Sequence, residues 1–174
     1  MLSAFLMLQL LENEMEFVIN EWFLEWHKPG AAPEEQRMAR AFTGWLLKSD
    51  HRIVMLRESD FTKKLNVIRR DFNYHPMSGI YLKLFFSQVI MSPERCRIVD
   101  DPPALTIETE GILKRPSTPP LSNIESDRYL FESAETTKEK IIVTTDAKLI
   151  QHFDGNDQFQ LWSTEDFFLK FEIL

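Results

Sequence analysis

The sequence has little cysteine and little glycine, and each shortage excludes a class of protein. Its single cysteine, Cys96, leaves no partner for an intramolecular disulfide and no cysteine cage for a metal ion. This cysteine usage is typical of a reducing compartment, so we expect a cytoplasmic protein. The 5 glycines include no glycine-rich phosphate-binding loop.

The chain also lacks an apolar run long enough to span a membrane. Its apolar N-terminal segment, Met1–Leu11, is well short of the ~20 residues that span a bilayer. The segment has no basic leader and continues into acidic residues without a small-residue cleavage site, so we do not expect a signal peptide. We expect instead a helix that packs on the core or on a partner chain.

What the chain does contain is enough apolar material for one sizeable core. The 174 residues are 44% hydrophobic and 12% aromatic. This length and composition predict a single domain that spans residues 1–174 and exclude a disordered tail.

Charge is distributed unevenly along the chain. The formal net charge is −7, from 20 basic and 27 acidic residues, but residues 48–97 alone carry a net +5. Residues 101–174 carry a net −7. We do not expect an acidic chain to bind nucleic acid over its whole surface. The net charge does not exclude a local basic surface beside an acidic site.

Apolar runs of strand length alternate with helical patterns along the chain. The runs predict strands over residues 16–20, 51–56, 97–99, 140–144 and 159–162. Helices are expected over residues 22–26, 33–46, 59–72, 77–91 and 126–137, and from residues 146 and 163. Residues 104–123 are expected to form a loop, with one edge strand at Leu105–Glu108. The alternation predicts an α/β fold with a mostly parallel sheet and helices on both faces.

Several acidic residues follow the predicted strands or begin the helices near them. Glu21, Asp60 and Asp146 follow predicted strands, and Asp127 begins a helix. In a parallel sheet these positions converge on the edge where ligands bind. Carboxylates without cysteine or paired histidine favour Mg²⁺ or Mn²⁺ over zinc. Each aspartate taken alone is more typical of a helix N-cap than of a metal ligand.

Three segments in the last third of the chain, residues 124–134, 141–149 and 162–168, resemble PIN-domain ribonucleases in order and spacing. The helix acid of that family matches Asp127, the strand-end Thr-x-Asp matches Thr144 and Asp146, and the closing helix start matches residues 163–166. The resemblance implies a Rossmann-like three-layer α/β/α sandwich. It also implies cleavage of single-stranded RNA with a divalent metal held by three or four acidic residues.

From the residues and the resemblance together we expect a divalent-metal-dependent endoribonuclease that uses Mg²⁺ or Mn²⁺. The candidate catalytic residues are Glu21, Asp127, Asp146 and Thr144. The candidate metal ligands are Asn20, Glu21, Asp60, Asp127 and Asp146, and the candidate RNA-backbone contacts are Lys63, Lys64, Arg69 and Arg70. Small proteins of this family are often toxins, so an antitoxin-like partner or a homodimer is expected, with Met1–Leu11 at the interface.

The N-terminal half departs from the family pattern. Asn20 stands where the family has its first aspartate, and Lys63 and Lys64 stand where a second acid is expected. The alternative hypothesis is therefore a catalytically degenerate PIN-like module that binds RNA or a partner. A nucleotide-binding or response-regulator-like domain is a third hypothesis, which the missing phosphate loop disfavours.

Overall fold

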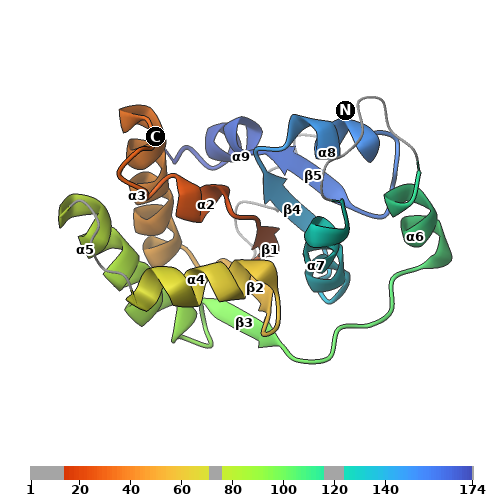
Figure 1. Ribbon diagram of the computed structural model, residues 1–174, viewed down its shortest axis with the longest axis horizontal. Coiled ribbons are helices and arrows are strands. Elements are labelled where there is room, and N and C mark those ends of the chain that lie inside the picture. Colours follow the sequence, from red (N-terminus) through yellow and green to blue (C-terminus); the bar gives the residue numbers. More distant parts are fainter. Residues whose placement is uncertain (1–13, 71–75, 116–123, 174) are drawn as a thin grey trace.

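The computed structural model describes residues 14–70, 76–115 and 124–173, and its strands form one five-stranded parallel sheet (Figure 1). The strands are β1 (Glu16–Ile19), β2 (Arg52–Leu56), β3 (Cys96–Val99), β4 (Ile141–Thr144) and β5 (Gln160–Ser163). They lie in the order β3-β2-β1-β4-β5. The chain thus builds outward from β1 to one side and then returns to build the other side, so the direction of winding reverses between β1 and β4.

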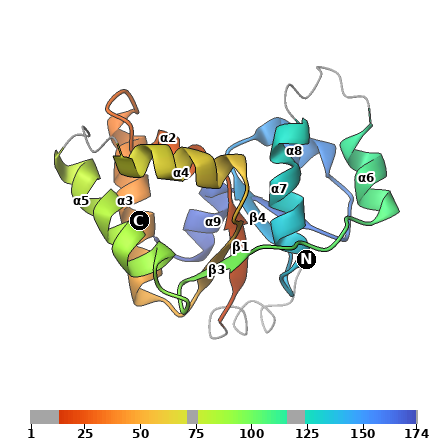
Figure 2. The ribbon, with the colours of Figure 1, turned by 60° about the horizontal axis from the view of Figure 1, so that its bottom comes forward.

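Helices cover both faces of this sheet, which makes a three-layer, Rossmann-like α/β fold. Figure 2 shows α3, α5 and α9 on one side of the sheet and α7 and α8 on the other. This is the arrangement that the alternating sequence pattern predicts. The helices are α2 (Trp22–Glu25), α3 (Pro33–Lys48), α4 (Asp60–Arg70), α5 (Pro76–Leu84), η1 (Phe85–Ile90), α6 (Ile107–Leu113), α7 (Ile124–Glu135), α8 (Ala147–His152) and α9 (Thr164–Lys170).

Aromatic side chains fill the core on both sides of the sheet. Phe17 of β1 is fully buried, and its ring lies 6.2 Å from that of Phe42 in α3 and 5.0 Å from that of Phe167 in α9. Phe131 of α7 stacks on Phe153 at 4.3 Å. Burial of side chains this large is the main contribution to stability in a domain of this size.

Two elements differ from their sequence-based expectation. The edge strand expected at Leu105–Glu108 is wrong, because α6 begins there. The Thr106 hydroxyl accepts a hydrogen bond from the Thr109 backbone N–H at 3.1 Å, and this N-cap starts a helix at Ile107. The single helix expected over residues 77–91 is α5 followed by η1, which is a π-helix. π-Helical turns, which are wider than α-helical turns, are frequent at functional sites.

Some predictions concern residues that the structure does not describe. The segment Met1–Leu11, expected at an interface, lies outside the described residues, as does Phe72 at the end of the helix expected over 59–72. Among the described helices, none has the length and apolar character needed to cross a bilayer.

His27 makes the stability of the fold sensitive to acid. Its side chain is 1% exposed, and burial lowers its pKa from 6.5 to about 4. Because the unfolded chain binds a proton between these values and the folded chain does not, stability falls as the pH drops from 6.5 to 4. The loss amounts to about 3 kcal/mol. Urea unfolding of His27→Leu should show a correspondingly flatter pH dependence than the parent protein, and an unchanged slope would contradict this assignment.

Candidate active site

The reversal between β1 and β4 places several polar residues at one edge of the sheet. In sheets of this type, ligands bind outside the carboxyl ends of the strands at the point where winding reverses. The β1–β4 register pairs Ile19 with Val143, so the next residues, Asn20 and Thr144, lie side by side. Glu21 and Asp146 follow them in the chain. The sequence pattern pointed to polar residues after several strands, and the order of the sheet makes β1 and β4 the neighbours.

Hydrogen bonds fix Asn20 and Thr144 in place. The Asn20 amide nitrogen donates to the Thr144 hydroxyl at 2.7 Å, and the Asp146 backbone N–H donates to the same oxygen at 3.0 Å. The Asn20 amide oxygen accepts from the Trp22 backbone N–H at 3.3 Å. Asn20 is 9% exposed, so this network is buried. Asn20 thus braces the ends of β1 and β4, and its amide oxygen is already used by the backbone.

Two carboxylates at this edge act electrostatically on a third, Asp127. We call Glu21, Asp127 and Asp146 the acidic cluster. Asp127 lies near the start of α7. Burial first, and then the charges of Glu21 and Asp146, raise the pKa of Asp127 from 3.8 to about 7. The cluster therefore holds a carboxyl group that is close to its titration point at neutral pH.

Tyr129 is a member of this environment that the sequence did not reveal. Its hydroxyl is buried and has no hydrogen bond of ordinary geometry within the described residues. Burial and the neighbouring Glu21 carboxylate raise the pKa of this hydroxyl well above its usual range. Its place beside Leu130 and Phe131 in the helix expected over residues 126–137 does not distinguish Tyr129 from a core residue. The Tyr129 hydroxyl is thus a buried donor next to the Glu21 carboxylate, at the acidic cluster.

The cations predicted to contact RNA separate into different environments. The Lys64 ammonium lies 3.3 Å from Glu21 Oε1 and lowers the pKa of Asp127, so it belongs with the acidic cluster. Lys63 is exposed and pairs with Asp60 at 3.1 Å, and the Asp60 charge helps to raise the pKa of Tyr129. Arg69 lines a different pocket, beyond α4. The side chain of Arg70 lies outside the described residues.

The donor chemistry of the cluster suits a hard divalent cation, but its present geometry is incomplete for one. The described residues contain no group of three histidine, cysteine, aspartate or glutamate side chains placed to hold a metal ion. One oxygen of Asp146 already caps α8, where it accepts from the backbone N–H groups of Lys148 at 2.9 Å and Leu149 at 3.1 Å. The Lys64 ammonium is the cation that Glu21 contacts. Metal binding would therefore require Lys64 to leave Glu21.

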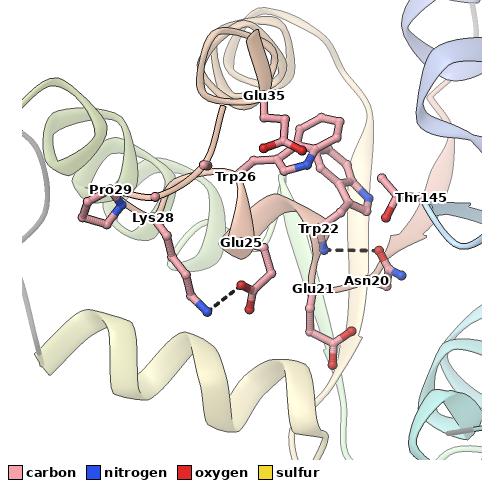
Figure 3. Close-up of a pocket in the computed structure, with 11 residues that line it drawn as sticks. Asn20, Glu21, Trp22, Glu25, Trp26, Lys28, Pro29, Glu35 and Thr145 are labelled. Atoms are coloured by element: carbon pink, nitrogen blue, oxygen red, sulfur yellow. Dashed lines mark hydrogen bonds and ion pairs between the residues drawn. The ribbon is translucent and has the colours of Figure 1, made fainter. Parts of the chain in front are cut away.

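A pocket of about 800 Å³ adjoins the cluster at Glu21, and Figure 3 shows the residues that line it. It shares Asn20, Glu21 and Thr145 with the strand ends, and the indole rings of Trp22 and Trp26 form an aromatic wall. The Trp22 indole N–H donates to the Val143 carbonyl at 3.1 Å and so ties this wall to β4. The space beside the acidic cluster is thus wide enough for a substrate larger than a single ion.

The walls of this pocket carry further charged groups that the sequence did not single out. Figure 3 shows Glu25 paired with Lys28, whose ammonium lies 2.5 Å from the carboxylate. Glu35 accepts a hydrogen bond from the Ala32 backbone N–H at 2.9 Å. Trp22 and Trp26 are also almost fully buried, so they pack in the core, and only the fold reveals their place in a pocket wall.

Comparison with known proteins adds no relative. No family model, curated protein or solved structure matches this chain. The resemblance of residues 124–168 to PIN-domain ribonucleases therefore stays a prediction from the sequence.

Proposed function

We propose that this chain is a divalent-metal-dependent endoribonuclease of PIN-like type that cleaves single-stranded RNA with Mg²⁺ or Mn²⁺. The observation that carries the proposal is the acidic cluster itself: the charges of Glu21 and Asp146 act on Asp127 where the winding of the sheet reverses. Carboxylates that share a site disfavour one another's charged form, and a bound divalent cation offsets this repulsion. The edge where they meet is the ligand-binding edge of such sheets.

Each residue has a distinct task in this proposal. Glu21, Asp127 and the second oxygen of Asp146 would hold the cation, which when bound polarises a phosphodiester and activates water. Thr144 positions Asn20 and the Asp146 backbone through two hydrogen bonds that its oxygen accepts. Tyr129 offers a hydroxyl donor, and Lys64, once it leaves Glu21, offers a positive charge to a phosphate.

Cleavage of a labelled single-stranded oligoribonucleotide tests the proposal. We expect products with millimolar Mn²⁺ and none when a chelator is added. Asp146→Asn should lose the activity, whereas Asp154→Asn, which alters an exposed carboxylate outside the cluster, should cleave as the parent protein does. Cleavage that survives chelation or Asp146→Asn would overturn the proposal.

Two contacts favour a second candidate, a catalytically degenerate PIN-like module that binds RNA or a partner. Asn20 donates to Thr144 in place of a carboxylate, and Lys64 already neutralises Glu21. Calorimetric titration with Mn²⁺ separates the candidates. Absence of binding at millimolar Mn²⁺ favours the degenerate module, and saturable binding favours the nuclease.

The proposal includes a cytoplasmic location and assembly with an antitoxin-like protein or a second copy of the chain. Cys96 is unpaired and buried, and burial raises the pKa of its thiol to about 12, which supports a structural role for it in a reducing compartment. The interface expected at Met1–Leu11 lies outside the described residues. Light scattering behind size-exclusion chromatography tests for the homodimer, and a monomeric mass at high concentration counts against it.

A further inference from the structure

A second pocket lies on the opposite side of α4 from the acidic cluster. It has a volume of about 580 Å³ and is formed by α4, η1 and the β2–β3 edge of the sheet. Thr62, Leu65, Asn66 and Arg69 line it from α4. Their spacing of three and four residues places them on one helix face. Lys64, which contacts Glu21, lies on another face of the same helix.

The floor of this pocket is apolar. Met55 and Ile98 contribute from the sheet, Leu65 from α4, and Phe86 and Ile90 from η1. At its border, Met91 is 70% exposed. The volume falls within the range of roughly 300–1,000 Å³ that is usual for small-molecule sites. Binding of a hydrophobic group to such an apolar floor is favourable because it displaces water from apolar surface.

The lining also contains polar side chains without a protein partner. Arg69, Asn66 and Ser87 lie at the solvent-exposed border of the pocket and make no side-chain hydrogen bond or ion pair within the described residues. Arg57 borders the pocket as well and pairs with Asp100. An unpaired guanidinium beside an apolar floor is complementary to an anionic head group, which it can bind through two parallel hydrogen bonds.

We infer that this pocket binds a small amphipathic anion, with an aliphatic or aromatic body on the apolar floor and a carboxylate or phosphate beside Arg69. The inference does not depend on the proposed nuclease activity, since α4 separates the pocket from the acidic cluster. An aliphatic carboxylate and a nucleoside monophosphate share this chemistry, and the test distinguishes these two sources.

Fluorescence titration with 1-anilinonaphthalene-8-sulfonate, an aromatic probe with one anionic group, measures binding to the folded full chain. We expect Arg69→Gln to weaken binding about tenfold. Arg37→Gln is the matched control, because Arg37 is exposed on α3 and pairs with Glu34. It should leave the affinity unchanged. Ser87→Trp, which fills the pocket from η1, should remove binding while circular dichroism shows an intact fold.

Competition identifies the source of the anion. Displacement of the probe by decanoate supports an aliphatic acid, and displacement by adenosine monophosphate supports a nucleotide. Failure of both ligands to displace the probe would overturn the inference. If an oligoribonucleotide displaces the probe where both ligands fail, the pocket is an RNA contact, and the inference is wrong in that case too. Equal probe affinity in the parent protein, Arg69→Gln and Ser87→Trp would overturn it too.

Discussion

Replacement of Asp127 by asparagine is expected to lower RNA cleavage at least about 100-fold and to make the protein more stable at alkaline pH. The loss of activity follows because asparagine cannot supply the negative charge that the proposed cation requires. The gain in stability follows because burial first, and then the charges of Glu21 and Asp146, raise the pKa of Asp127 to about 7. A residue that lowers the stability of the fold but takes part in the chemistry is typical of an active site.

The pH dependence of this gain has a definite sign. The Asp127 pKa is 3.8 in the unfolded chain and about 7 in the folded one. Folding is therefore not penalised below pH 3.8, and the penalty grows as the pH rises to about 7 and is constant above it. Because Asp127 is partly open to solvent, we expect a difference of roughly 1–2 kcal/mol at alkaline pH after screening.

Urea unfolding of the parent protein and Asp127→Asn across this range measures the effect. The two stabilities should converge in acid and separate as the pH rises. Asp154→Asn is the matched control and should stay within about 0.5 kcal/mol of the parent protein throughout. If Asp127→Asn were the less stable protein at alkaline pH, the proposed repulsion within the acidic cluster would be wrong.

Replacement of Lys64 by methionine should strengthen Mn²⁺ binding at least about tenfold, which is ~1.4 kcal/mol. The Lys64 ammonium contacts Glu21 at 3.3 Å and competes with any other cation for the acidic cluster. Methionine keeps much of the apolar length of lysine but removes its charge. Calorimetry with Mn²⁺ measures the affinity without reference to activity.

The neighbouring lysine supplies the control for this experiment. Lys63 is exposed and pairs with Asp60, outside the acidic cluster, so Lys63→Met should change Mn²⁺ affinity far less than Lys64→Met. Weaker Mn²⁺ binding by Lys64→Met than by the parent protein would show that the ammonium holds Glu21 in a binding position. The idea of competition would then be wrong.

The sequence predicted the parallel sheet, and it pointed to acidic residues after its strands, because both depend on local patterns. Apolar runs marked the strands, and Asp146 and Asp127 could be placed because they follow a strand and begin a helix. The two adjacent lysines could not be separated in this way. Successive residues on a helix point in directions about 100° apart, and only the packing of α4 decides that Lys64 meets Glu21 while Lys63 does not.

Tertiary contacts also explain the other surprises. Tyr129 has the sequence pattern of a core aromatic residue, and its hydroxyl lies beside the Glu21 carboxylate only because of how α7 packs. Arg69 reads as part of one basic helix surface with Lys63 and Lys64. The structure places it on a different helix face, over an apolar pocket built from segments distant in the sequence.

The pairing of β1 with β4 makes the geometry of the candidate site depend on the packing of the aromatic core. Ile19 pairs with Val143, and this register sets Asn20 against Thr144. A slip of one residue would turn Phe17 away from Phe42 and Phe167, because neighbouring strand residues face opposite sides of the sheet. A one-residue deletion within β1 that misaligns the site therefore also disrupts the aromatic core. The packing of the core thus favours the strand register that the site requires.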